Sequence, residues 1–332
     1  MNPVRSAIAA LLVPVIVSVC ATACSSGSGT KASGGAKSIV LYTCASANVE
    51  QAVVKGFQAA HPGTSVQVFR APTGQLNARV AADLRSGGIR ADVIWACDPL
   101  TMHGYDKQRL LRAWTPANAA DIPAAYRTPN YTGIDLLYVV LAVRKGVAAP
   151  QSWSGLTDRS LRNAVALPSP SVAASALGAL GYLSSVPGYG MSFYRALHAN
   201  GAQQVDTPAA ALTGVETGAY RVGVTLANAA YADQRKGSPI SVVWPRPGGI
   251  AIYAPIGLTA RTHPADLAAR FADYAAGLDA QRLMAQQDTY PVLPGLGGPP
   301  LPGGSTVVSP DWPSLYDGYQ GLLAQYVALF GS

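Results

Sequence analysis

Past residue 37, short apolar runs alternate with amphipathic stretches. Residues 38–44 and 91–97 are apolar and rich in β-branched and aromatic side chains, which predicts buried strands. Within residues 49–57, apolar positions recur every four residues, as on one face of a helix, and residues 76–84 repeat the pattern. A compact alternation of strand and helix predicts a parallel sheet with right-handed crossovers.

A second alternating unit lies between two long apolar strands, predicted at residues 136–143 and 250–258. Two long strands that bracket a separate unit predict two lobes joined by two chain crossings. The expected fold is therefore α/β with two lobes, each a parallel-rich sheet flanked by helices, and the crossing strands as hinge. Residues 265–284 then form one helix or two.

The predicted boundaries follow from these strands. Residues 38–138 and 255–290 are assigned to lobe 1, and residues 139–254 to lobe 2. Residues 291–332 contain a Pro/Gly-rich segment and a C-terminal helix, whose lobe the pattern leaves open.

The beginning of the chain has the layout of an export signal. Arg5 precedes the uncharged apolar run 6–19, and small residues come directly before Cys24. This resembles the lipobox of bacterial lipoproteins, so residues 1–23 are expected to be a cleaved signal peptide with Cys24 lipidated. The Gly/Ser-rich residues 24–37 would then be a flexible tether to the extracytoplasmic face of the cell membrane. An uncleaved membrane anchor is the alternative.

Composition, charge and the absence of known motifs exclude several classes of function. The chain is 49% hydrophobic and 12% charged, with a net charge of +7. Its charges are scattered singly, apart from a short basic cluster near Arg235 and Lys236, so no nucleic-acid-binding patch is expected. Nucleophile-elbow, dinucleotide-binding and Walker motifs are absent, and so are zinc-ligand spacings of His or Cys. We therefore expect no enzyme activity, cofactor or metal site, and a secreted hydrolase is the function class with least support.

Polar residues follow several predicted strands of lobe 1, where ligands of open parallel sheets bind. The candidate ligand-binding residues there are Thr43, Cys44, Ser46, Thr73, Gly74 and Asp98. Asp98 is suited to an amine, although Asp before Pro at a helix start also acts as an N-cap. Cys44 and Cys97 end strands that are neighbours in a doubly wound sheet, and export places them in an oxidising compartment, so a disulfide between them is predicted.

Several spaced motifs between Ile39 and Val292 together resemble the type 2 periplasmic binding proteins of ABC importers, in the branch for ferric iron, phosphonates, sugar phosphates and thiamine. The motif residues that carry this resemblance are Tyr42, Thr43, Asp92, Val93, Trp95, Pro150, Ser152, Trp153, Leu156, Tyr194, Leu197, Gly201, Val215, Gly218, Tyr220, Gly223, Thr225, Phe271, Asp273, Tyr274 and Gln281. The resemblance implies two lobes that close on a small ligand and a permease that recognises the closed form. A ligand sensor for a signalling receptor would have the same fold.

The resemblance also bears on the ligand. Members that carry ferric iron use a His after the first strand and two adjacent tyrosines, whereas this chain has Ser46, Ala229 and Ala230 at those places. Tyr220 or Tyr231 is a shifted substitute, so a ferric carrier remains the alternative.

The expected ligand is instead a phosphonate, phosphate ester or other small organic anion. Ser171 matches the family's serine that opens an anion-binding helix, so the N–H groups of Val172 and Ala173 are predicted to bind the anion. Thr225 and Asn228 add uncharged donors, and Tyr253 is placed to stack on a ring. Thiamine-like and other amine ligands stay open.

Overall fold

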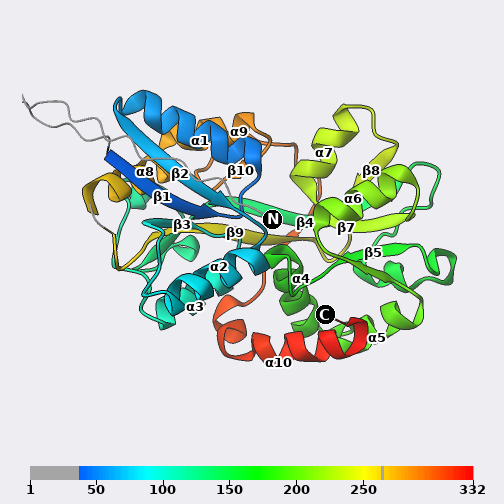
Figure 1. Ribbon diagram of the computed structural model, residues 1–332. Coiled ribbons are helices and arrows are strands. Elements are labelled where there is room, and N and C mark those ends of the chain that lie inside the picture. The colour runs from blue at the N-terminus through cyan, green and yellow to red at the C-terminus, as the bar shows by residue number, and fades with distance from the viewer. Residues whose placement is uncertain (1–36, 263–264, 332) are drawn as a thin grey trace, which may run out of the picture. The chain divides into compact units, whose positions relative to one another are not determined.

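The computed structural model describes residues 37–262 and 265–331 (Figure 1). The strands are β1 (Lys37–Thr43), β2 (Thr64–Arg70), β3 (Val93–Trp95), β4 (Tyr131–Arg144), β5 (Val165–Pro168), β6 (Gln203–Val205), β7 (Val222–Leu226), β8 (Ile240–Val243), β9 (Gly249–Leu258), β10 (Tyr290–Pro291) and β11 (Val307–Val308). The α-helices are α1 (Ala47–Ala60), α2 (Thr73–Arg85), α3 (Pro99–Lys107), α4 (Ala174–Ser185), α5 (Gly190–Ala199), α6 (Pro208–Thr217), α7 (Ala227–Arg235), α8 (Ala265–Ala276), α9 (Leu278–Gln286) and α10 (Trp312–Phe330).

The strands of the described chain form one sheet, and eight of them follow the order β2-β1-β3-β9-β4-β7-β5-β6. Beside this path, β8 and β10 pair with β4, and β11 pairs with β9. β1 pairs in parallel with both β2 and β3, as the strand–helix alternation predicted, and β5 pairs in parallel with β6 and β7. The apolar face of α1 is buried in one core with Ile39 and Leu41 of β1. In the same core, the ring of Phe57 packs edge-on against Phe271 of α8, with ring centres 5.1 Å apart.

Two strands cross between the halves of the sheet, as predicted. β4 pairs with β9 along Tyr131–Val139 and then with β7 and β8 along Val139–Arg144. The α/β, two-lobed expectation is therefore confirmed, while the residues assigned to each lobe stay a prediction. β4 begins at Tyr131, earlier than the expected residue 136, and its pairing shifts register between Gly133 and Asp135.

Residues 265–284 contain parts of two helices. α8 ends before Gly277, where a Cβ would lie 3.1 Å from the carbonyl oxygen of Asp273, and α9 starts directly after it.

The C-terminal helix α10, whose lobe the sequence left open, contacts elements on both sides. It packs on α3 of the first lobe and on α4 and α5 of the second, along the lower edge of the view in Figure 1. The ring of Tyr316 stacks on His103 of α3 at 3.7 Å, and Tyr326 meets Tyr194 of α5 at 5.4 Å. In the described residues, no helix combines the length and the apolar character needed to cross a membrane.

Candidate functional site

A cavity of about 330 Å³ lies between the two lobes, and we call it the interlobe cleft. The first lobe contributes the chain after β1 and β3 and the starts of α1 and α2, and the second contributes the starts of α4, α6 and α7. The crossing strand β4 adds Asp135 and Leu137. This is the place where the strand-end argument put the ligand.

The structure brings seven of the twelve predicted ligand-binding residues to this cleft. The residues that line it are Cys44, Ser46, Thr73, Val172, Ala173, Thr225 and Asn228. The residues that do not line it are Thr43, Gly74, Asp98, Ser171 and Tyr253.

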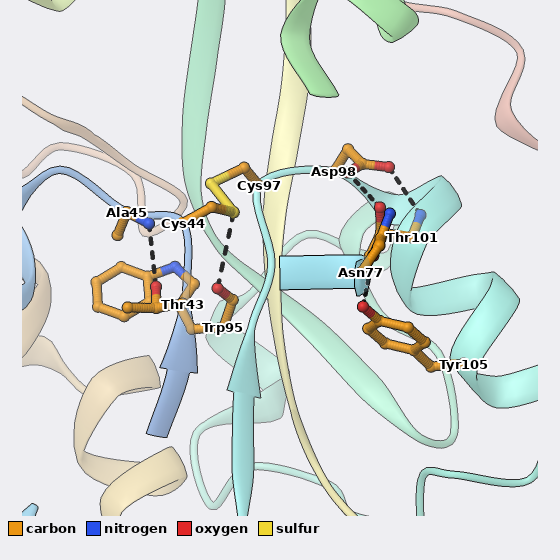
Figure 2. The surroundings of a disulfide bond; sticks show 9 residues. All are labelled: Thr43, Cys44, Ala45, Asn77, Trp95, Cys97, Asp98, Thr101 and Tyr105. Carbon is orange, nitrogen blue, oxygen red and sulfur yellow. Dashed lines mark hydrogen bonds between the residues drawn. A yellow bond between two sulfur atoms is a disulfide. The ribbon is translucent and has the colours of Figure 1, made fainter. Parts of the chain in front are cut away.

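Asp98 acts as the N-cap of α3. It is 1% exposed, and its two oxygens accept hydrogen bonds from the Thr101 N–H at 2.7 Å and the Thr101 hydroxyl at 2.8 Å (Figure 2). Burial raises the pKa of its carboxyl, and the bonds from Thr101 act in the opposite direction. The capping alternative explains this residue, because both carboxylate oxygens already have donors.

Thr43 and Tyr253 are occupied by local packing. Thr43 is fully buried, and its hydroxyl accepts a hydrogen bond from the Ala45 N–H at 3.0 Å (Figure 2). The ring of Tyr253 is 4% exposed and packs near Tyr126 and Trp312, at 5.4 and 6.0 Å between centres. Both residues are therefore part of the protein interior that surrounds the cleft.

The prediction of a helix starting at Ser171 is wrong, since α4 begins at Ala174. The N–H groups of Val172 and Ala173 donate to the carbonyl of Ser169, at 3.1 and 2.9 Å, and are not free for a ligand. The chain forms a turn at residues 169–173 before the helix starts. The free N–H groups at the helix N-terminus are therefore those from Ala174 onward, because the helix starts three residues later than predicted. Among the described residues, no acceptor faces the N–H groups of Ala174 and Ser175.

Gly74 joins the lobes directly. Its N–H donates to the carbonyl of Val172 at 3.1 Å, and a Cβ at this position would lie 3.0 Å from the carbonyl oxygen of Ser171. The residue predicted to touch the ligand therefore makes a contact between the lobes beside the cleft, where a side chain would interfere.

Four helix N-termini without a side-chain cap open into the cleft. Their N-cap residues, all of which line the cavity, are Ser46 (α1), Pro72 (α2), Ala173 (α4) and Leu226 (α7). The first N–H groups of a helix carry partial positive charge and need acceptors, which a bound anion supplies. Arg70, at the end of β2, adds the one cationic side chain among the described residues that line the cleft.

A buried carboxyl group that the sequence reading missed also lines the cleft. Asp135 is 4% exposed, and its Oδ1 has no hydrogen-bond partner in the described structure. Burial raises the pKa of this carboxyl to about 7, and the neighbouring Trp95 indole has a smaller, opposite effect. A lone acidic residue next to an apolar strand would have pointed to Asp135 in the sequence, but the predicted strand began at residue 136, one position too late to include it.

Three other buried polar atoms of the cleft residues also lack partners. They are Nε1 of Trp95, Oδ1 of Asn228 and Oγ1 of Thr289. Buried polar groups are almost always hydrogen-bonded in native proteins, so a group of unpartnered atoms around one cavity indicates a place for a polar ligand.

The predicted disulfide is present at the edge of the cleft. Cys44 follows β1 and Cys97 follows β3, and the bridge joins them with 5.9 Å between their Cα atoms (Figure 2). Because β1 and β3 are direct neighbours in the sheet, the bridge links the two chain segments that follow these strands and line the cleft on the side of the first lobe.

The tyrosines considered for iron do not line the cleft. The hydroxyl of Tyr231 accepts a hydrogen bond from Nε1 of Trp244 at 3.0 Å, and the ring of Tyr220 covers Gly214. Ala229 lines the cavity and Ala230 is fully buried. Within the described residues, no three His, Cys, Asp or Glu side chains gather as a metal-binding group.

Comparison with solved structures shows the same fold elsewhere. AfuA of Actinobacillus pleuropneumoniae, solved with exogenous fructose-6-phosphate, has a TM-score of 0.79 at 17% identity over 89% of this chain and 99% of its own. A substrate-binding protein of an ABC transporter from Agrobacterium tumefaciens gives 0.79 at 17% identity, over 90% of this chain and 95% of its own. Iron-bound HitA of Pseudomonas aeruginosa gives 0.74 at 16% identity, over 88% and 99%.

A family model identifies the chain by sequence. No match was found among proteins of curated function. The model of the bacterial extracellular solute-binding proteins matches residues 39–287, most of the chain and nearly the whole stretch over which the motifs were found. The chain therefore belongs to the bacterial extracellular solute-binding proteins and has the two-lobed fold of the type 2 periplasmic binding proteins that serve ABC transporters.

Proposed function

We propose that this protein binds a small organic anion, such as a phosphate ester or phosphonate, in the interlobe cleft and delivers it to an ABC transporter permease. The observation that carries the proposal is the convergence of four uncapped helix N-termini, with Arg70 beside them, on one cavity. Such donors hold an anion without a buried cationic side chain that would be left unpaired after release, which suits a carrier.

Ferric iron is the second candidate because some structural neighbours bind it, among them iron-bound HitA. The chemistry of this cleft gives it less support. Ferric iron needs several anionic oxygen ligands, and Asp135 is the one carboxylate among the described residues that line the cavity. The chain also has alanines, at positions 229 and 230, where the iron-binding members of the family have their tyrosines, and of the two only Ala229 lines the cleft.

A matched pair of variants at Ala173 tests the anion site. Asp and Asn are both good N-caps for α4, so both variants should fold, but only Ala173→Asp places a negative charge where the anion is expected. We expect Ala173→Asp to weaken binding of ethyl phosphate, methylphosphonate or glycerol 3-phosphate by about tenfold or more, and Ala173→Asn to weaken it far less. Isothermal titration calorimetry provides the measurement.

Two outcomes would contradict the proposal. One is equal affinity of the Ala173→Asp and Ala173→Asn proteins for the anion that the wild type binds. The other is failure of the wild type to bind any of these anions while it forms a stoichiometric, coloured complex with ferric citrate, which would establish the iron alternative.

We further propose that the protein is held at the extracytoplasmic face of the cell membrane by a lipid on Cys24, which lies outside the described residues. The signal-like layout of residues 1–23 supports this location. Cys24→Ser should leave the protein unprocessed or release it from the membrane fraction, as seen by fractionation and a mobility shift. Unchanged partition and mobility of the variant would exclude lipidation at this residue.

We also propose that the bound molecule leaves chemically unchanged, so that the protein is a carrier and not an enzyme. The hydrolase alternative predicts release of inorganic phosphate from a bound phosphate ester, which a colorimetric assay detects. A sensor would instead bind a receptor, so purified permease and receptor ectodomains offered to the liganded protein distinguish import from signalling.

A further inference from the structure

Asp135 differs from Asp98 and Asp83, the two other aspartates that are buried in the described part of the chain. Asp98 has both oxygens bonded to Thr101. Asp83 is 3% exposed and accepts from the hydroxyl of Tyr42 at 2.7 Å, with the Arg79 guanidinium 3.1 Å away. Asp135 has neither a cationic partner nor a donor to Oδ1 among the described residues.

The place of Asp135 in the fold excludes a simple packing role. The pairing of β4 with β9 shifts register between Gly133 and Asp135, and such an irregularity re-aims the side chains that follow it. The side chain after this shift lines the interlobe cleft. An apolar residue would suit a buried β4 position better than an unpartnered carboxyl, since burying an unpaired charge is unfavourable.

Apart from the indole N–H of Trp95, which neighbours this carboxyl, the unpartnered groups of the cleft residues carry oxygen atoms that accept hydrogen bonds. Asn228 presents its amide oxygen without a partner, and the Thr289 hydroxyl is also unpartnered. A ligand that satisfies both Oδ1 of Asp135 and Oδ1 of Asn228 must bring hydrogen-bond donors, because a carboxylate oxygen and an amide oxygen only accept. A carboxylate without a counter-ion further favours donors that carry positive charge.

We propose that the transported molecule is a zwitterion, whose protonated amine binds Asp135 while its anionic group binds the helix N-termini of the cleft. This inference rests on the anion site proposed above and narrows the ligand class to amine-bearing organic anions. From the sequence, Asp98 was the candidate to bind an amine. We assign that role to Asp135 instead, because both carboxylate oxygens of Asp98 already accept hydrogen bonds from Thr101.

The raised pKa of Asp135 agrees with this assignment. Burial raises the pKa of its carboxyl to about 7, so the charged form is less favoured there than in water. An ammonium group within hydrogen-bond distance compensates the charge and returns the pKa toward its ordinary value. A neutral hydroxyl would leave the charge uncompensated when the lobes close over it.

The test compares ω-aminoalkyl phosphates of two, three and four carbons with alkyl phosphates of the same length, which lack only the amine. Calorimetry is done at about pH 8, where Asp135 is mostly ionised. For at least one length, we expect the aminoalkyl phosphate to bind the wild type about tenfold or more tightly than its partner.

Asp135→Asn should remove this preference while keeping the affinity for the alkyl phosphate, which shows that the variant is folded. Asp98→Asn is the matched control, because Asn also caps a helix and the residue lies off the cleft, and it should keep the preference. Equal binding of both members of every pair by the wild type overturns the inference and leaves the anion site intact. Absence of binding by every phosphate contradicts the anion site and, with it, this inference.

Discussion

Replacing Cys44 and Cys97 together by Ala is expected to lower the free energy of unfolding by about 4 kcal/mol. The two cysteines are separated by 53 positions, and in the chain-entropy model closure of a loop of that length restricts the unfolded chain by this amount. Urea denaturation of the wild type and the double variant, both under non-reducing conditions, measures the difference.

Reductant provides the control for this experiment. It should destabilise the wild type by a similar amount and leave the Ala double variant unchanged, because the variant has no bridge to lose. A double variant within about 1 kcal/mol of the oxidised wild type would show that the bridge contributes little beyond what the neighbouring strands β1 and β3 already fix. Since Cys44 and Cys97 line the cleft, ligand affinity should also fall in the double variant.

The second large effect is expected at Gln281, which holds the bulged part of β4 in place. Its side chain is fully buried, and Nε2 donates to the carbonyls of Ile134 at 2.5 Å and Ala275 at 3.2 Å. Its Oε1 accepts from the N–H of Val292 at 3.0 Å. The amide therefore connects α8, α9, the residue before Asp135 and the chain after β10.

Gln281→Leu keeps the volume but removes these hydrogen bonds. The carbonyl of Ile134 and the N–H of Val292 keep only their long mutual contact of 3.4 Å, so we expect a loss of about 2–3 kcal/mol in unfolding free energy. Gln286→Leu, on the exposed end of the same helix, is the matched control and should change stability by less than about 0.5 kcal/mol. Equal effects of the two substitutions would show that the buried network does not stabilise the fold.

The order of the elements and the two crossing strands could be predicted from the sequence, because both depend on local patterns of apolar and polar residues. Apolar runs and four-residue periodicity are set by which face of a strand or helix is buried, and they are visible without the partner. The long runs at β4 and β9 indicated the lobes, and the strand ends indicated the edge where Cys44 and Cys97 meet.

Capping was predictable only in part. Asp98 before Pro99 gives the same signal whether the carboxyl caps α3 or faces a ligand, and only the contacts to Thr101 decide between them. At α4 the serine motif suggested a start at Ser171, yet the Ser169 carbonyl takes two N–H groups and delays the helix to Ala174. Such competition for a single acceptor is settled by backbone geometry, which residue types do not specify.

What the sequence by itself determined is therefore the two-lobed α/β architecture, the family and seven of the residues that line the cleft. Only the tertiary structure placed four uncapped helix starts around one cavity, gave α10 contacts with both lobes and left Asp135 buried without a partner. The physical reason is that hydrophobic periodicity is a local property of the chain. Whether a polar atom is satisfied, and which helix ends converge, depends on residues far apart in sequence that the fold alone brings together.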